Sequence, residues 1–334
     1  MGKAQQKCGW GVAGTGWVAS DFVVPAMLQQ GSRLVACVGS TPEKSRAFAG
    51  RFGFERAHDD LQSLLDDAAV DAVYIALPNA LHHAAVLAAA RAGKHILCEK
   101  PFAMTLEHAR DMVKACRDAN VILRIAHQIR LDAAVTRARE IVRSGRLGRL
   151  AEISLERGSA NPPRKTWRLD NAQSGVIFDV GVHLLDLIQW ISGQRFVEVS
   201  AFSHPDRKLG NSDDTITVLG RLDGDCHAVA RATREVGSAE NNLIVEGADA
   251  TLYTSSLRFA QEHIVYVRDK NGVTEERFAA SPAYAWQVRA FEGELRGERS
   301  LLPDGEESLK NVATTQSVLQ SIDERRIMPV PATA

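Results

Sequence analysis

Cysteine is scarce in this sequence, and none of its five cysteines forms a C-x-x-C pair. Structural zinc sites and redox motifs need cysteines at such short spacings, and small secreted proteins use many cysteines as a disulfide framework. The sequence therefore predicts no metal site and no disulfide framework. It fits a reducing compartment, and we expect a cytoplasmic protein.

Excess charge of either sign is also missing, because 40 Lys and Arg residues stand against 41 Asp and Glu residues, for a net charge of −1. Proteins that bind nucleic acid or an anionic membrane usually carry a clear positive excess. Long apolar runs are missing too, since glycines interrupt the apolar stretch near the N-terminus. We therefore expect no nucleic-acid partner, no membrane span and no signal peptide.

Length, by contrast, is ample. The 334 residues, 45% of them hydrophobic, exceed what one core usually serves, so two domains are expected. In residues 1–127, short apolar runs alternate with helical patterns, which predicts parallel βαβ units and an α/β Rossmann dinucleotide-binding domain. Its strands are predicted at residues 9–14, 33–39, 69–77, 95–99 and 121–127.

Residues 128–334 have a different order of predicted elements, because strands follow one another without helices between them. This predicts an α+β domain for substrate binding, with an open, largely antiparallel sheet and one helical layer. The second face of such a sheet needs a cover, which indicates a homo-oligomer. The strands are predicted at residues 151–159, 196–203, 214–222, 226–234, 242–248, 250–256 and 263–269, and the helices at 131–144, 174–192, 284–297 and 306–323.

A glycine-rich stretch lies between the first predicted strand and the first predicted helix. Gly14, Gly16 and Ala19 form the pattern G-x-G-x-x-A, with Trp17 and Val18 inside it. The first glycine suits a tight turn, and the second lets the backbone approach a pyrophosphate at a helix N-terminus. Glycines often do no more than shape a turn, but this position before a helix favours cofactor binding.

The end of the second predicted strand bears on the choice of cofactor. NAD sites usually carry an acidic residue there for the ribose 2′-hydroxyl, whereas this chain has Gly39. Ser40, Thr41 and Lys44 follow and could hold a 2′-phosphate, or could simply form a solvated helix start. We expect NADP, with NAD as the alternative.

Three further motifs follow in order along the chain. They are Pro78-Asn79-Ala80-Leu81-His82, Ala92-Gly93-Lys94-His95 followed by Glu99-Lys100-Pro101, and Asp179-Val180-Gly181-Val182-His183. Together with the glycine-rich stretch they resemble the signatures of the glucose–fructose oxidoreductase and inositol dehydrogenase (Gfo/Idh/MocA) family. The sequence looks most similar to the 1,5-anhydrofructose reductase branch, which shares Trp167-Arg168-Leu169.

The chain departs from that branch in two places. It has Gly14-Thr15-Gly16 where the branch tends to carry Ala-Ser-Thr, and Ala-His-Gln around His127 where the branch carries Asn-His-His. The resemblance implies a nicotinamide cofactor, a sugar or polyol substrate, a homodimer or homotetramer built through the open sheet, and a cis bond before Pro101. His127, Trp167 and Arg168 are the predicted substrate residues. The predicted cofactor residues are Gly14, Gly16, Trp17, Val18, Ser40, Thr41, Lys44, Leu77, Asn79, His82, Glu99 and Lys100.

Lys100, Asp179 and His183 are the predicted catalytic residues. Lys100 comes just after a strand, and ligands of open α/β sheets bind beyond the carboxyl ends of the strands. Asp179 and His183 are four residues apart in a helical pattern and share one face. We expect His183 to donate the proton during reduction while Lys100 orients and polarises the substrate, and the reverse assignment stays open.

Other readings remain. Lys100 could be a surface lysine, His183 a core histidine, Asp179 a helix cap, and His82 a residue that only orders its loop. The leading function is a reductase or dehydrogenase of sugars or polyols. The alternatives are a trans-dihydrodiol or aldose dehydrogenase and, in another class, a non-catalytic NAD(P)-binding sensor or regulator.

Overall fold

The computed structural model describes residues 7–158, 174–205, 213–236, 241–255, 257 and 261–333. By its internal packing the chain divides into two units, Met1–Gln128 with Ala283–Ser308, and Ile129–Pro282 with Leu309–Ala334. The two-domain division after residue 127 stays a prediction. The packing differs from it in one respect, because Ala283–Ser308 belongs with the first unit and not with the second.

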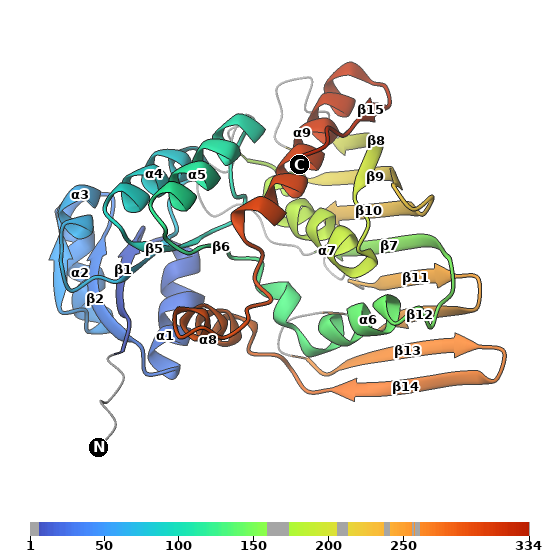
Figure 1. Ribbon diagram of the computed structural model, residues 1–334, viewed down its shortest axis with the longest axis horizontal. Helices are drawn as coiled ribbons and strands as arrows, with labels where there is room; N and C mark the ends of the chain where they lie inside the picture. Colours follow the sequence, from blue (N-terminus) through green and yellow to red (C-terminus); the bar gives the residue numbers. More distant parts are fainter. Residues whose placement is uncertain are drawn as a thin grey trace. The chain divides into compact units, whose positions relative to one another are not determined.

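The first unit contains a parallel sheet with the strand order β3-β2-β1-β4-β5-β6 (Figure 1). This is the order of a Rossmann domain, so the predicted fold class is confirmed. Strand β3 was not predicted, since its three residues carry no apolar run. The strands are β1 (Gly9–Ala13), β2 (Arg33–Val38), β3 (Arg56–His58), β4 (Ala72–Ile75), β5 (His95–Cys98) and β6 (Leu123–Ile125).

Two helices of this unit begin where their sequences predict. The Thr41 and Thr105 hydroxyls accept hydrogen bonds from the backbone N–H groups of Lys44 and His108, so both threonines are N-caps. Helices α4 and α5 pack side by side. The helical segments are η1 (Ala19–Val23), α1 (Val24–Gln29), α2 (Pro42–Phe52), α3 (Leu61–Leu65), η2 (Asn79–Leu81), α4 (His82–Arg91), α5 (Leu106–Asp118) and α8 (Ala283–Leu295).

Helix α8 joins the first unit through aromatic contacts. The Trp10 ring lies 5.2 Å from that of Phe291, and its indole N–H donates to Glu292 Oε1 at 2.8 Å. Phe22 and Tyr284 stack with their ring centroids 4.8 Å apart. These contacts place α8 against η1 and α1, the helical segments that follow the glycine-rich turn (Figure 1).

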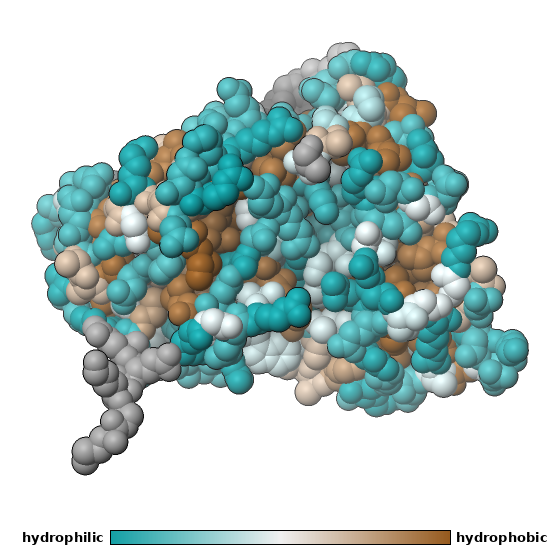
Figure 2. All heavy atoms as spheres, in the orientation of Figure 1, coloured by the Kyte–Doolittle hydropathy of each residue, from teal (hydrophilic) through white to brown (hydrophobic). Residues whose placement is uncertain are grey.

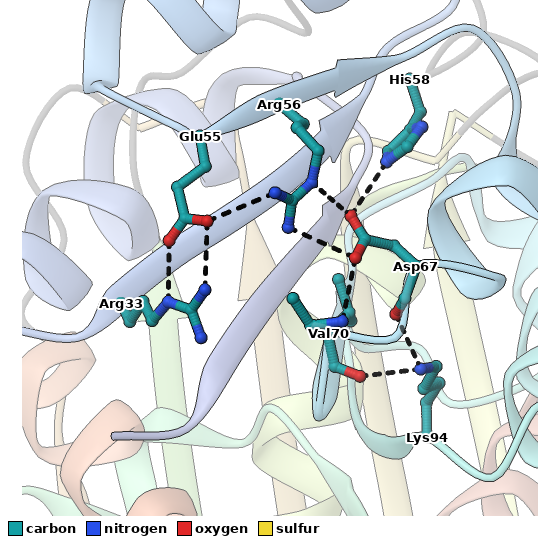
Figure 3. Close-up of polar contacts among 8 residues, drawn as sticks. Arg33, Glu55, Arg56, His58, Asp67, Val70 and Lys94 are labelled. Carbon is teal, nitrogen blue, oxygen red and sulfur yellow. Dashed lines mark hydrogen bonds and ion pairs between the residues drawn. The ribbon is translucent and has the colours of Figure 1, made fainter. Parts of the chain in front are cut away.

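The edge of the parallel sheet where β4 and β5 begin is held by a polar network (Figure 3). The Lys94 ammonium donates to the backbone oxygens of Asp67, at 3.0 Å, and Val70, at 2.8 Å. The Asp67 carboxylate in turn binds Arg56 and His58. Lys94, the lysine of the A-G-K-H motif, therefore stabilises the fold at the edge opposite the carboxyl ends of the strands.

The second unit contains a sheet that shows nine strands in the described residues, in the order β14-β13-β12-β11-β7-β10-β9-β8-β15. All pairs are antiparallel except β7 with β10, so the sheet is mixed but largely antiparallel. The strands are β7 (Leu150–Gly158), β8 (Phe196–His204), β9 (Thr215–Leu222), β10 (His227–Thr233), β11 (Leu243–Gly247), β12 (Ala250–Thr254), β13 (His263–Asp269), β14 (Gly272–Phe278) and β15 (Met328–Pro329).

One helical layer covers this sheet. Helix α7 packs on β7 and β10, and α6 packs on β13 (Figure 1). Alternate residues of the strands, such as Ile216 and Val218 in β9, point into the resulting core. The remaining helical segments are η3 (Gln128–Leu131), α6 (Ala133–Arg143), η5 (Ile177–Gly181), α7 (Val182–Ser192) and α9 (Gly305–Glu324).

The face of the molecule drawn in Figure 2 is largely hydrophilic, with apolar side chains gathered in small groups. Within the described part of the chain, no helix combines the length and the apolar character needed to cross a membrane.

Candidate active site

The glycine-rich turn adopts a conformation that only glycine accepts readily. Gly14 has a φ of +103°, and a Cβ there would lie 2.3 Å from the backbone oxygen of Ala76. The first glycine therefore lets this turn pass close to the chain after β4, at the start of a helical segment where a pyrophosphate group can bind. The residues present fit a dinucleotide.

The helical segment after this turn contains a π-helical stretch, η1, and continues as the α-helix α1 from Val24. Trp17 precedes it, and the Trp17 ring meets that of Phe22 edge-on, with centroids 5.0 Å apart. Isolated π turns inside helices are frequent at functional sites. Trp17 and Val18 are half-buried here.

The turn after β2 brings the predicted 2′-phosphate residues together. The Lys44 ammonium donates to the Ser40 hydroxyl at 3.0 Å, and the Gly39 N–H donates to the buried Ser45 hydroxyl at 2.8 Å. A Cβ on Gly39 would lie 2.9 Å from the Thr15 hydroxyl oxygen. The turn is thus tightly built, and it contains hydroxyls and a cation where NAD sites usually carry a carboxylate.

The segment after β5 places Lys100 at the carboxyl edge of the sheet. Glu99 is buried, and its carboxylate accepts a hydrogen bond of 2.6 Å from the Tyr74 hydroxyl in β4. Burial, followed by the nearby Glu99 charge, raises the pKa of Tyr74. The bond between Lys100 and Pro101 is cis, as the family resemblance implied.

His82, the first residue of α4, is buried beside this segment. Its Nδ1 lies 2.9 Å from the backbone oxygen of Pro101, and its Nε2 lies 3.0 Å from that of Leu77. Burial is the main cause that lowers the pKa of His82, and the positive charge of Lys100 lowers it further.

In the second unit, Asp179 lies in η5 and His183 lies in the first turn of α7. The two helical segments follow each other directly, so the four-residue spacing puts both side chains on one face. His183 is buried, whereas Asp179 is half-buried. Here too a π turn adjoins the candidate residues.

Sequence reasoning missed a buried ion pair on this helix. Asp186, three residues after His183, binds Arg130 of η3 through two hydrogen bonds of 2.7 and 2.6 Å. Asp186 could have been noticed as a carboxylate in an apolar helix, but nothing in the sequence pointed to Arg130. Tyr74, the partner of Glu99, was missed as well.

The predicted site residues divide between the two units. Asp179 and His183 lie in the second unit, while the predicted cofactor residues, together with Lys100 and the buried His127, lie in the first. The predicted substrate residues Trp167 and Arg168 lie outside the described residues. No group of three or more His, Cys, Asp or Glu side chains that could hold a metal is found in the part that the structure describes.

Comparison with known proteins decides the family. Residues 8–127 match the model of an oxidoreductase family with an NAD-binding Rossmann fold, and residues 135–253 match the Gfo/Idh/MocA C-terminal domain. The chain belongs to the Gfo/Idh/MocA family. The resemblance drawn from the motifs is confirmed, and with it the prediction of an enzyme, an oxidoreductase of this family.

Individual members of the Gfo/Idh/MocA family match nearly the whole chain. A 1,5-anhydro-D-fructose reductase of Ensifer adhaerens is 31% identical over 319 residues, which covers 93% of this chain and 95% of that protein. A D-xylose 1-dehydrogenase (NADP(+)) of Haloferax volcanii is 27% identical over 94% of this chain and 97% of its own.

A solved structure shows the same fold. Levoglucosan dehydrogenase in complex with NADH and L-sorbose superposes with a TM-score of 0.87 at 22% identity, covering 98% of this chain and all of the other. The chain thus shares its two-sheet fold with that solved structure.

Proposed function

We propose that this protein transfers hydride between NADP and a carbonyl or hydroxyl carbon of a sugar or polyol, as a 1,5-anhydrofructose reductase does. The observation that carries the proposal is the position of Lys100. It directly follows β5 and Glu99 at the carboxyl edge of a sheet whose first turn is shaped for a dinucleotide. Ligands of open parallel sheets bind at that edge.

The proposed chemistry divides among three side chains. A bound nicotinamide cofactor supplies or accepts the hydride. Lys100 donates a hydrogen bond to the substrate oxygen and polarises it, and His183 gives the proton to that oxygen during reduction. Asp179, on the same helix face as His183, is proposed to bind a sugar hydroxyl. The assignment with Lys100 as the proton donor is the alternative.

The cofactor is proposed to be NADP. Ser40, Thr41 and Lys44 offer two hydroxyls and an ammonium at the end of β2, and Gly39 stands where NAD sites usually carry a carboxylate. The name of the Haloferax volcanii relative includes NADP, which supports this choice, whereas levoglucosan dehydrogenase has NADH in its structure.

The remaining cofactor residues are assigned by their place at the carboxyl edge. Gly14, Gly16, Trp17 and Val18 form the turn toward the pyrophosphate, and Leu77, Asn79 and Glu99 follow β4 and β5 near the nicotinamide end. For the substrate we propose His127, Trp167 and Arg168, on the family resemblance alone.

We further propose that the second sheet pairs with a second copy of this chain, as a dimer or within a tetramer. Its strands expose large apolar side chains, Phe202 of β8, Leu219 of β9 and Ile244 of β11. Each directly follows a buried residue in its strand, such as Val218 before Leu219, so these three point away from the core. We also propose a cytoplasmic location, because all five cysteines are free, four of them buried, as is usual in a reducing compartment.

The direct test follows nicotinamide absorbance with NADPH or NADH against carbonyl sugars, and with the oxidised cofactors against aldoses, cyclitols and diols. Turnover of 1,5-anhydrofructose with NADPH is expected. Turnover of xylose alone would instead indicate an aldose dehydrogenase, and turnover of a trans-dihydrodiol alone would indicate a trans-dihydrodiol dehydrogenase. Cofactor binding without turnover of any compound would indicate a non-catalytic NAD(P)-binding sensor or regulator.

A further inference from the structure

His82 connects two segments that are separate in the sequence. It is 1% exposed, and its two ring nitrogens lie within hydrogen-bond distance of the backbone oxygens of Leu77 and Pro101. Leu77 follows β4 and Pro101 follows β5. One imidazole therefore ties together the chain after two neighbouring strands, at the edge that carries Lys100.

The two contacts involve both nitrogens of the His82 ring. A neutral imidazole donates through one nitrogen only, so it satisfies one of the two carbonyls, and the imidazolium satisfies both. Burial and the Lys100 charge oppose the imidazolium. The ring thus faces two acceptors and one cation. Both nitrogens lie against backbone oxygens, which leaves neither of them for a cofactor.

The neighbouring His83 does not share the contacts of His82. The backbone of Phe102 also faces the His82 ring. His83, the next residue, instead contacts α5, where its ring stacks on that of His108 at 4.1 Å and lies 3.5 Å from the carboxylate of Asp111. The two adjacent histidines therefore have different neighbours, and only His82 contacts the backbone next to Lys100.

We propose that His82 is a positioning residue, which ties the Leu77 and Pro101 segments together and thereby sets the place of Lys100, and that it does not contact the cofactor. The inference rests on the proposed role of Lys100. Pro101 is the next residue after Lys100. Removing the His82 imidazole therefore removes a contact that fixes the backbone beside Lys100 and, with it, the position of the Lys100 ammonium. Misplacement of a catalytic group by about 1 Å can lower the rate by about 100-fold.

The kinetic test compares His82→Phe, which keeps a ring but has no donor, with His82→Gln, which keeps an amide donor. The same substitution at the neighbouring position, His83→Phe, is the matched control. We expect kcat to fall by about 10- to 100-fold in His82→Phe and less in His82→Gln. The KM for the sugar and the Kd of NADPH should stay within about threefold in both. His83→Phe should keep the wild-type kcat.

A second arm needs no turnover, so it also applies if the proposed reaction is wrong. In Lys100→Met the cation near His82 is gone, and the ¹⁵N NMR titration of the His82 ring should move to higher pH. An unchanged titration would show that the ring and Lys100 are not neighbours and would overturn the inference. A weaker NADPH Kd in His82→Phe with an unchanged kcat at saturation would overturn it too, since His82 would then be a cofactor ligand. If His82→Phe does not fold, the titration of the His82 ring in Lys100→Met decides alone.

Discussion

Arg130 and Asp186 form a two-point ion pair inside the second unit, with side chains that are 3% and 4% exposed. The Arg130 guanidinium also lies 5.3 Å from the centre of the Trp190 ring. Asp186 and Trp190 share a face of α7 with His183, at spacings of three and seven residues. The pair therefore anchors the helix that carries the proposed proton donor.

Removing one partner of this pair should lower the stability of the second unit far more than replacing both partners. Arg130→Ala leaves the Asp186 carboxylate buried without its guanidinium, and we expect a loss of about 3–5 kcal/mol in the free energy of unfolding of that unit. The double variant Arg130→Met with Asp186→Leu should unfold near the wild-type midpoint in urea. The exposed pair Arg221 and Glu198 is the control, since Arg221→Ala should leave the midpoint unchanged. Equal losses in the single and double Arg130 variants would contradict the argument.

Lys100 should be needed for turnover but not for cofactor binding. Lys100→Met removes the ammonium that polarises the substrate oxygen, so kcat/KM should fall by about 100- to 10,000-fold while the Kd of NADPH stays within about threefold. Lys94→Met is the control, because Lys94 binds backbone oxygens at the opposite edge. It should lower the melting temperature and keep kcat. Near-normal turnover in Lys100→Met would remove Lys100 from the mechanism.

The sequence predicted those features of the fold and site that depend on neighbouring residues. The turn at Gly14, the N-caps Thr41 and Thr105, and the arrival of Lys100 at a strand end all follow from local rules. The spacing of Asp179 and His183 likewise needed only helical geometry.

Features that depend on distant residues could not be predicted. The helical pattern of α8 gave no sign that Glu292 would bind Trp10, a residue at the other end of the chain. The alternation of β10 gives its buried face but not its partner, so its parallel pairing with β7 was missed. Arg130 and Asp186 are 56 residues apart, and a single sequence contains no link between them.

Gly39 should control the choice between NADP and NAD. Gly39→Asp puts a carboxylate beside Ser40 and Lys44 that repels a 2′-phosphate and can accept a hydrogen bond from a 2′-hydroxyl. We expect kcat/KM to fall by about 10- to 100-fold with NADPH and to fall much less, or to rise, with NADH. Gly39→Ala is the control, because its Cβ meets the Thr15 hydroxyl at 2.9 Å without adding charge. It should affect both cofactors alike, and an equal loss with both in Gly39→Asp would contradict the proposed site.

Mild acid should destabilise the first unit through His95. Its Nδ1 accepts a hydrogen bond of 3.1 Å from the backbone N–H of Ile122, which requires that nitrogen to be unprotonated. Burial, the largest cause, lowers its pKa from the ordinary histidine value of 6.5, although Asp71 and Glu294 oppose the shift. The unfolded chain therefore binds the proton more tightly than the folded one, so stability falls as pH drops through about 6.5 toward the lower folded pKa.

His95→Asn tests this, because an amide oxygen can accept from the Ile122 N–H but does not titrate between about pH 5 and about pH 7.5. The urea midpoint of the wild type should decrease over that range, and the midpoint of His95→Asn should decrease less. Buried His82, whose pKa is lowered in the same direction, contributes equally to both proteins and cancels in the comparison. Carboxylates with lowered pKa values, such as Asp67, lose their contribution only below about pH 4. Parallel curves for the two proteins would show that His95 does not link folding to pH.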